Sequence, residues 1–221
     1  MRVLVGCEYS GRVRNAFRDK GVEAWSCDLL PSDDCSPYHL QGDVFQFVAM
    51  GFDLAIFHPP CTYLTASAEW CYRDTQNKAM SPGVLYGTER RQAREAAIAF
   101  VVKLSELPIH YIAIENPVGV LSSRWRKPDQ FIQPYAFGED ASKKTCLWLK
   151  NLPLLRPTSY VEPRLVQASN GILRPRWGNQ TDSGQNKEPP SKDRWKTRST
   201  TWQGWADAMA EQWGGLLPPT T

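Results

Sequence analysis

Short apolar runs alternate with amphipathic segments along the first 150 residues of the chain. The runs with the length and composition of buried strands are 3–7, 23–27, 54–57, 110–114 and 145–149. Apolar side chains recur at helical spacing in the segments 12–20 and 88–107. Because strands that alternate with helices form mostly parallel sheets, this pattern predicts an α/β fold with a doubly wound, largely parallel sheet.

The apolar run 54–57 ends in a strongly constrained turn. His58, Pro59, Pro60 and Cys61 follow it directly, and proline cannot donate to a sheet ladder, so the strand must stop here. Most cysteines are buried core residues, but two consecutive prolines make burial of Cys61 in an apolar layer awkward. Open α/β sheets bind ligands at the carboxyl ends of their strands. We therefore interpret Cys61 as a candidate nucleophile.

Polar residues also follow the other predicted strands. They are Glu8, Tyr9, Ser10 and Gly11 after the first run, Asp28 after the second, Asp43 before the third, and Glu115, Asn116 and Pro117 after the fourth. Each aspartate taken alone fits an ordinary loop residue, because Asp favours turns. Glu115 offers an acid that could work together with the Cys61 thiol.

The predicted helix 88–107 is preceded by a long stretch without periodicity. We expect Thr88 to cap the helix, and Arg90, Arg91 and Arg94 to form a solvated face. The stretch 65–87 contains several aromatic residues. Structureless segments of this length in a compact domain are often functional, so we expect a lid.

Composition divides the chain into three parts. Residues 1–166 are predicted to form the core. Residues 167–198 are rich in Asn, Gln, Gly, Ser, Pro and basic residues, which indicates a short basic loop region with little core of its own. Residues 199–221 include a segment, 204–213, with helical spacing that we expect to pack back on the core.

Charge and cysteine content narrow the class of protein. The net charge of +3 and the pI near 8.5 are compatible with a polyanionic partner but do not require one. The six cysteines include no Cys-x-x-Cys pair, so reduced thiols and no metal site are expected. No stretch approaches the roughly 20 apolar residues of a membrane span, and the apolar run at the start is too short for a signal peptide. We expect a cytoplasmic protein.

In order and type, the polar motifs resemble those of the cytosine-5 DNA methyltransferases. Pro59-Pro60-Cys61 stands where that family has its nucleophile turn, and Glu115-Asn116 stands where it has Glu-Asn-Val, with Pro117 replacing the valine. The resemblance covers roughly residues 1–150. It implies a compact, divergent member with a reduced target-recognition region and the Rossmann-like fold of S-adenosylmethionine-dependent methyltransferases.

The resemblance also implies the catalytic residues. Cys61, held by Pro60, would add to carbon 6 of cytosine, which makes carbon 5 nucleophilic enough to accept a methyl group. Glu115 would protonate or hydrogen-bond ring nitrogen 3, and Asn116 would hold the loop beside it. The target base would have to leave the duplex to reach these groups.

S-adenosylmethionine is the methyl donor that the resemblance implies. The residues assigned to the cofactor are Asp28 at the ribose hydroxyls, Asp43 at the adenine amino group, Glu8, Tyr9, Ser10 and Gly11 at the methionine end, and Pro59. The family's Phe-x-Gly-x-Gly turn keeps only one glycine here, Gly11.

DNA is the implied partner, and no membrane or metal is expected. Lys143 and Lys144 stand nearest to the family's Gln-x-Arg-x-Arg segment, and Arg194 and Arg198 could contact phosphates. Because the region 167–198 offers few residues to read bases, target recognition is expected to be minimal or to come from a protein partner.

Two other interpretations remain open. The same fold and cofactor could methylate RNA, a free nucleotide or an exocyclic amino group, although amino-methylating enzymes carry an aromatic residue where Cys61 stands. The chain could also be a catalytically idle nucleic-acid-binding module, against which the joint presence of Cys61 and Glu115 argues.

Overall fold

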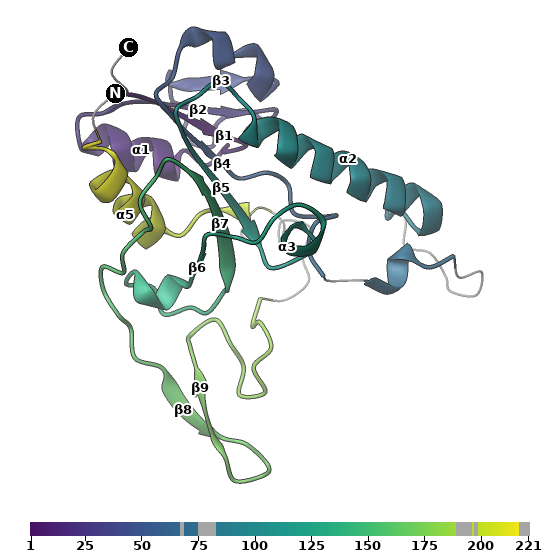
Figure 1. Cartoon of the computed structure of the whole chain (residues 1–221). Coiled ribbons are helices and arrows are strands. Elements are labelled where there is room, and N and C mark those ends of the chain that lie inside the picture. Colours follow the sequence, from purple (N-terminus) through teal and green to yellow (C-terminus); the bar gives the residue numbers. More distant parts are fainter. Residues whose placement is uncertain (67–68, 75–82, 189–195, 197–198, 217–221) are drawn as a thin grey trace.

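A computed structural model describes residues 1–66, 69–74, 83–188, 196 and 199–216. A seven-stranded sheet with the order β3-β2-β1-β4-β5-β7-β6 forms the centre of the molecule (Figure 1). Its strands are β1 (Arg2–Gly6), β2 (Glu23–Asp28), β3 (His39–Gln41), β4 (Leu54–Phe57), β5 (Tyr111–Pro117), β6 (Gln130–Ile132) and β7 (Thr145–Lys150). Strands β1 to β5 are parallel, whereas β6 and β7 run antiparallel.

Helices cover both faces of this sheet. They are α1 (Arg12–Asp19), α2 (Gly87–Ser105), α3 (Leu121–Arg124) and α5 (Gln203–Trp213), with short 3-10 turns η1 (Val44–Gln46), η2 (Val48–Met50), η3 (Glu69–Tyr72) and η4 (Pro134–Ala136). Alternate residues of β4 point to opposite faces, so Leu54 and Ile56 join one apolar cluster and Ala55 and Phe57 the other. The predicted fold class, a doubly wound and largely parallel Rossmann-like sheet, is confirmed.

The last helix packs back onto the first. Figure 1 shows α5 beside α1 on one face of the sheet, and Trp205 and Trp213 of α5 are buried in the apolar cluster of that face. The Trp213 indole N–H donates to the carbonyl of Pro153 at 3.1 Å, so this large side chain is buried without losing its hydrogen bond. The region after residue 198 therefore completes the main core.

Helix α2 differs from the sequence-based prediction in two ways. It begins at Gly87, which has a positive φ of 53°, and Thr88 provides no cap. The expected solvated face is also wrong for two of its arginines. Arg90 is only 6% exposed, and the Arg94 guanidinium carbon lies 3.4 Å from the centre of the Tyr72 ring. Arginine can bury its stem and stack its planar head on an aromatic ring, which apolar periodicity alone does not reveal.

Arg91 and Arg94 of α2 hold the segment that follows Cys61. Arg94 donates to the carbonyl of Tyr63 at 3.0 Å and Arg91 donates to the carbonyl of Tyr72 at 2.7 Å. The expected lid, residues 65–87, lies partly outside the described residues, and within it the segment 69–74 contacts α2 through Arg91 and Arg94. Closure of a lid therefore stays a prediction.

The predicted loop region contains a two-stranded hairpin. It consists of β8 (Arg164–Gln167) and β9 (Leu173–Arg176), and it extends from the body of the molecule (Figure 1). Leu165 and Leu173 are 64% and 58% exposed, respectively, so this hairpin adds little to the core. The hairpin crosses the proposed boundary at residue 166/167, and the division into three parts remains a prediction. Within the described ranges, no helix is long and apolar enough to span a bilayer.

Candidate active site

The register of two neighbouring strands brings the Cys61 turn and the Glu115 turn together. In the parallel pair β4–β5, Phe57 lies opposite Ile114, so the next residues, His58 and Glu115, lie side by side where β4 ends. The expected end of the strand before Glu115 is wrong, because β5 continues through Pro117 and pairs there with the antiparallel strand β7. His58 Nδ1 and Glu115 Oε2 are 3.1 Å apart. The two side chains are 7% and 12% exposed, so this contact is largely shielded from water.

A second contact fixes the backbone of the proline turn. The Asn116 side-chain amide donates to the carbonyl of Pro59 at 2.7 Å, and Asn116 is buried. The Cys61 carbonyl accepts from the backbone amides of Leu64 and Thr65 at 3.0 and 3.1 Å, so the chain turns immediately after the half-buried cysteine. Pro59 and Pro60 have no backbone N–H to donate in this turn, and the hydrogen bond from Asn116 ties the Pro59 carbonyl to β5.

The loop after Asn116 crosses directly over the segment that follows Cys61. Gly119 makes this crossing possible, because a Cβ there would lie 1.9 Å from the carbonyl oxygen of Leu64. The amide of Val120 donates to that same carbonyl at 2.8 Å. The two loops are therefore joined by the backbone as well as by Asn116.

Burial and the neighbours of Glu115 have opposite effects on the pKa of its carboxyl group. Burial raises its pKa, while the hydrogen bond from His58 and the positive charge of Lys143 lower it, and the net effect is a pKa below the usual range for glutamate. Within the described chain, Glu115 Oε1, His58 Nε2 and Asn116 Oδ1 are buried and have no hydrogen-bond partner. Buried polar atoms are normally paired, so these three atoms mark a site that can accept a polar ligand.

The β1–α1 turn is organised by Glu8. This buried carboxylate accepts from the backbone amides of Val13 and Arg14 at 2.7 and 3.3 Å, which caps the first turn of α1 in place of Gly11. Burial raises the pKa of Glu8, and the nearby charge of His58 opposes this shift. Gly11 has a φ of 70°, and a Cβ there would lie 2.1 Å from the Arg14 guanidinium. A conformation that favours glycine explains why this one glycine of the turn is kept.

The other two predicted residues of this turn are Tyr9 and Ser10. Tyr9 is 7% exposed, and its hydroxyl contacts the carbonyl of Lys196 and the hydroxyl of Ser199. Ser10 is half-buried. The turn therefore connects to the C-terminal part of the chain.

A cavity of about 360 Å³ lies at the carboxyl ends of β1, β2 and β4. Its lining includes three predicted site residues, Asp28, Asp43 and Pro60, together with apolar side chains of η1 and α2, including Val44 and Phe100. Burial raises the pKa of Asp28, and its Oδ1 accepts from the amide of Leu30 at 2.9 Å. Two carboxylates beside an apolar slot suit a nucleoside, whose hydroxyl and amino groups donate hydrogen bonds and whose ring is apolar.

Cysteines 7 and 27 also line this cavity. Burial, reinforced by the negative charges of Asp28 and Asp43, raises the pKa of both thiols, that of Cys27 to about 12. Both are therefore neutral thiols at physiological pH and poor nucleophiles. Cys7 adopts a positive φ of 58°, which is unusual for a residue with a side chain.

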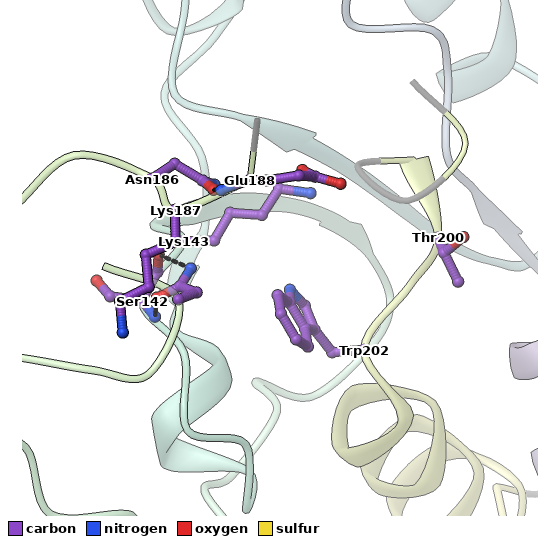
Figure 2. A pocket seen from close by; sticks show the side chains of 8 residues that line it. Ser142, Lys143, Asn186, Lys187, Glu188, Thr200 and Trp202 are labelled. Atoms are coloured by element: carbon purple, nitrogen blue, oxygen red, sulfur yellow. Dashed lines mark hydrogen bonds between the residues drawn. The ribbon is translucent and has the colours of Figure 1, made fainter. Parts of the chain in front are cut away.

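A second cavity has a volume of about 440 Å³. Its lining residues are mostly polar and come from three separate parts of the chain: Ser142 and Lys143 before β7; Asn179, Asn186, Lys187 and Glu188 after the hairpin; and Thr200 and Trp202 before α5. Figure 2 shows the Trp202 ring on the side nearest α5, across the cavity from Lys143 and Lys187. Lys143 connects this cavity to Glu115, because its charge acts on that carboxyl group.

The structure thus brings together most, but not all, of the predicted residues. Lys144 points its ammonium group at the Phe131 ring, 4.2 Å from the ring centre, whereas Lys143 lines the polar cavity. Arg194 and Arg198 lie outside the described residues. No cluster of side chains suited to a metal ion occurs in the described part of the chain.

Among the residues at these sites that had no assigned role in the sequence analysis are His58, Tyr63 and Trp202. His58 was visible beside the two prolines, but nothing in the sequence gives its contact with Glu115. Tyr63 and Trp202 line the two cavities, and their side-chain positions depend on tertiary packing. Only the position of His58 directly after a buried strand could have indicated its role.

Comparisons with known proteins give similarities of fold but no sequence family. No family model and no curated protein matches the chain. One similar solved structure is that of a candidate DNA modification methyltransferase encoded within an E. coli prophage, with 14% identity over 73% of this chain and 52% of that chain and a TM-score of 0.45. A mutant of DNMT2 from Spodoptera frugiperda has 15% identity over 75% and 58% of the two chains and a TM-score of 0.41.

A third similar structure is the Dnmt2 methyltransferase of S. pombe, with 18% identity over 70% of this chain and 52% of that chain and a TM-score of 0.41. The chain therefore spans little more than half the length of these three proteins. At such identities they resemble the chain in fold only, so the function has to be inferred from the site itself.

Proposed function

We propose that this protein transfers a methyl group from S-adenosylmethionine to carbon 5 of cytosine in DNA, through a covalent adduct with Cys61. One observation carries the proposal. The turn that holds Cys61 is tied to Glu115 and Asn116, and its Pro60 lines a cavity suited to a nucleoside.

Cys61 and Glu115 act on opposite parts of the cytosine ring. The thiolate of Cys61 forms a bond to carbon 6, and the electron pair of the carbon 5–carbon 6 double bond moves through the ring toward nitrogen 3. Glu115 gives a proton to nitrogen 3, so the ring becomes a neutral enamine that is nucleophilic at carbon 5. Carbon 5 then takes up the methyl group, and water removes the proton that carbon 5 still carries. The carbon–sulfur bond breaks to release the Cys61 thiolate, and nitrogen 3 returns its proton to the Glu115 carboxylate.

S-adenosylmethionine fits the cavity lined by Asp28 and Asp43 and supplies an electrophilic methyl group. Asp28 would accept hydrogen bonds from the ribose hydroxyls, and Asp43 would accept from the adenine amino group, while Val44 and Phe100 would contact the ring. Pro60, in the same lining, places the nucleophile turn at the edge of this cavity. Glu8 holds the β1–α1 turn through α1, and Gly11 gives the turn its shape.

The cavity lined by Lys143, whose charge acts on Glu115, is the proposed place for the acceptor. Lys143 and Lys187 bring positive charge to a phosphate or a base oxygen, and the Trp202 ring offers an apolar surface for stacking. A cytosine must leave the duplex to reach it. Few residues remain to read a sequence, so recognition of the target site by a partner protein is part of this proposal.

The test is mass analysis of nucleosides after incubation of the protein with S-adenosylmethionine and DNA. We expect 5-methyl-deoxycytidine, in amounts that fall at high salt because phosphate contacts are screened. Parallel incubations with RNA and with free nucleotides serve as controls. If methylation appears only in those incubations, DNA is the wrong acceptor; if a methylated exocyclic amino group appears, the Cys61 mechanism is wrong.

Removal of the Asp28 carboxylate should weaken cofactor binding. The variant Asp28→Ala loses charge-assisted hydrogen bonds, each worth about 1.5 to 3 kcal/mol, so we expect the Kd for S-adenosylmethionine to rise about 10- to 100-fold. Isothermal titration calorimetry measures this directly. Asp33→Ala is the matched control, because Asp33 is exposed in the following loop and does not line the cavity. Equal affinities for Asp28→Ala and wild type would remove Asp28 from the cofactor site.

A further inference from the structure

The residue before the proline turn makes the closest contact to the proposed acid. His58 Nδ1 lies 3.1 Å from Glu115 Oε2, while Oε1 has no partner within the described structure. The backbone of His58 is fixed, because His58 follows a fully buried strand and precedes Pro59, and its amide donates to the carbonyl of Gly6 at 3.0 Å. One carboxylate oxygen is thereby held and the other is left for a ligand.

The surroundings of His58 are charged on both sides. Glu115 lies beside it on β5, and Glu8, at the end of β1, acts on it electrostatically from the cofactor turn. Lys143 and Cys146, before and within β7, interact with Glu115, and Arg14 of α1 interacts with Glu8. His58 therefore interacts with two carboxylates that are buried or nearly so, and its Nδ1 lies within hydrogen-bond distance of the one that is proposed to act as an acid.

We propose that His58 is a positioning residue for methyl transfer, which rests on the function proposed above. Its Nδ1–H donates to Glu115 Oε2, so that Oε1 faces the acceptor ring. When Cys61 bonds to carbon 6, nitrogen 3 takes the proton from Oε1, and the carboxylate that remains keeps the hydrogen bond from His58. The stabilised carboxylate lowers the barrier to addition.

Glu115 must change its protonation state during the reaction, and the hydrogen bond from His58 affects this change. Because burial is outweighed by the His58 hydrogen bond and the Lys143 charge, the free protein holds Glu115 with a lowered pKa, as a carboxylate near neutral pH. With the acceptor in place, the lone pair of nitrogen 3 beside Oε1 disfavours the charged carboxylate and favours its acid form. His58 sets both how readily Glu115 takes up the proton and how readily it gives the proton away.

The test compares the pH dependence of kcat for three variants, because kcat reports the titration of groups in the complex with the acceptor. His58→Leu removes the donor, so kcat should fall about 10- to 100-fold. The alkaline limb of its profile should move to higher pH, because Glu115 without this hydrogen bond keeps its proton longer. His58→Gln retains a neutral donor and should stay within about 10-fold of wild type. The matched control is His110→Gln, since exposed His110 lies beyond the opposite end of β5 and should change nothing.

Two results would overturn the role of His58: an unchanged alkaline limb in His58→Leu, or a His58→Gln variant no more active than His58→Leu. A second readout is independent of activity. The carboxyl carbon of Glu115 can be followed by carbon-13 NMR and assigned with Glu115→Gln. Its titration midpoint should lie below the usual range for glutamate in wild type and at higher pH in His58→Leu. If this midpoint shifts but wild type methylates no cytosine, the proposed function fails and the His58–Glu115 contact stands. If the midpoint does not shift, the positioning role fails whatever the activity.

Discussion

Replacement of Cys61 by alanine is expected to reduce methyl transfer by at least about 10,000-fold, which is the scale of loss when a covalent nucleophile is removed. Without the thiolate, carbon 5 of cytosine never becomes an enamine carbon, and no other group replaces this step. The variant should bind S-adenosylmethionine normally, because the cavity that contains Asp28 and Asp43 does not include the Cys61 side chain in its lining. Nucleoside mass analysis and calorimetry measure the two quantities separately.

Cys35→Ala is the matched control for this substitution. Cys35 is exposed in the loop after β2, so its removal should leave activity unchanged. The neighbouring thiols cannot substitute for Cys61, because the pKa values of Cys7 and Cys27 are raised by burial. Methylation by Cys61→Ala at more than a few per cent of the wild-type rate would contradict the proposed mechanism.

The second large effect is expected for Glu115→Gln. Glutamine keeps the shape of the side chain and a hydrogen bond to nitrogen 3, but it cannot give up a proton, so we expect a loss of about 100- to 10,000-fold in kcat. The control Glu95→Gln changes an exposed glutamate of α2 that pairs with Arg124 at the surface. If Glu115→Gln and Glu95→Gln were equally active, Glu115 would have no role as an acid.

Glu115 should also show its lowered pKa in the pH dependence of stability. A carboxyl whose pKa is lower in the folded state stabilises the protein above its unfolded pKa of about 4.3, and this contribution is lost as the pH falls through the folded value. The difference in free energy of unfolding between wild type and Glu115→Gln should therefore shrink below about pH 4.3. Urea denaturation at several pH values measures this difference.

The sequence predicted the core of the fold because the buried strands are short, apolar and separated by polar turns. Leu54–Phe57 is buried along its whole length and stops at the prolines, as expected. The arginines of α2 show where the pattern fails, since Arg90 and Arg94 look like a solvated face in the sequence but stack on aromatic rings of a distant loop. A charged residue that is buried by its partner carries no periodic signal.

The candidate site could be predicted as a set of strand ends but not as a geometry. The register of β4 and β5 follows from the whole sheet, and only this register makes His58 a neighbour of Glu115. The same limit applies to the polar cavity, where Lys143 and Trp202 come from regions about 60 residues apart in the sequence. Glu8 shows the opposite case, because a predicted cofactor residue is seen to cap α1 with both carboxylate oxygens.

The central claim is that Cys61 forms a covalent bond to carbon 6 of cytosine during methyl transfer. DNA that contains 5-fluorocytosine tests it most directly. Fluorine replaces the proton on carbon 5 whose loss releases Cys61, so the covalent adduct should persist. With S-adenosylmethionine present, mass spectrometry should find the wild-type protein linked to this DNA through the peptide that contains Cys61, and should find no linkage in Cys61→Ala. A methylated DNA product without any such adduct, or an adduct on another cysteine, would contradict the account.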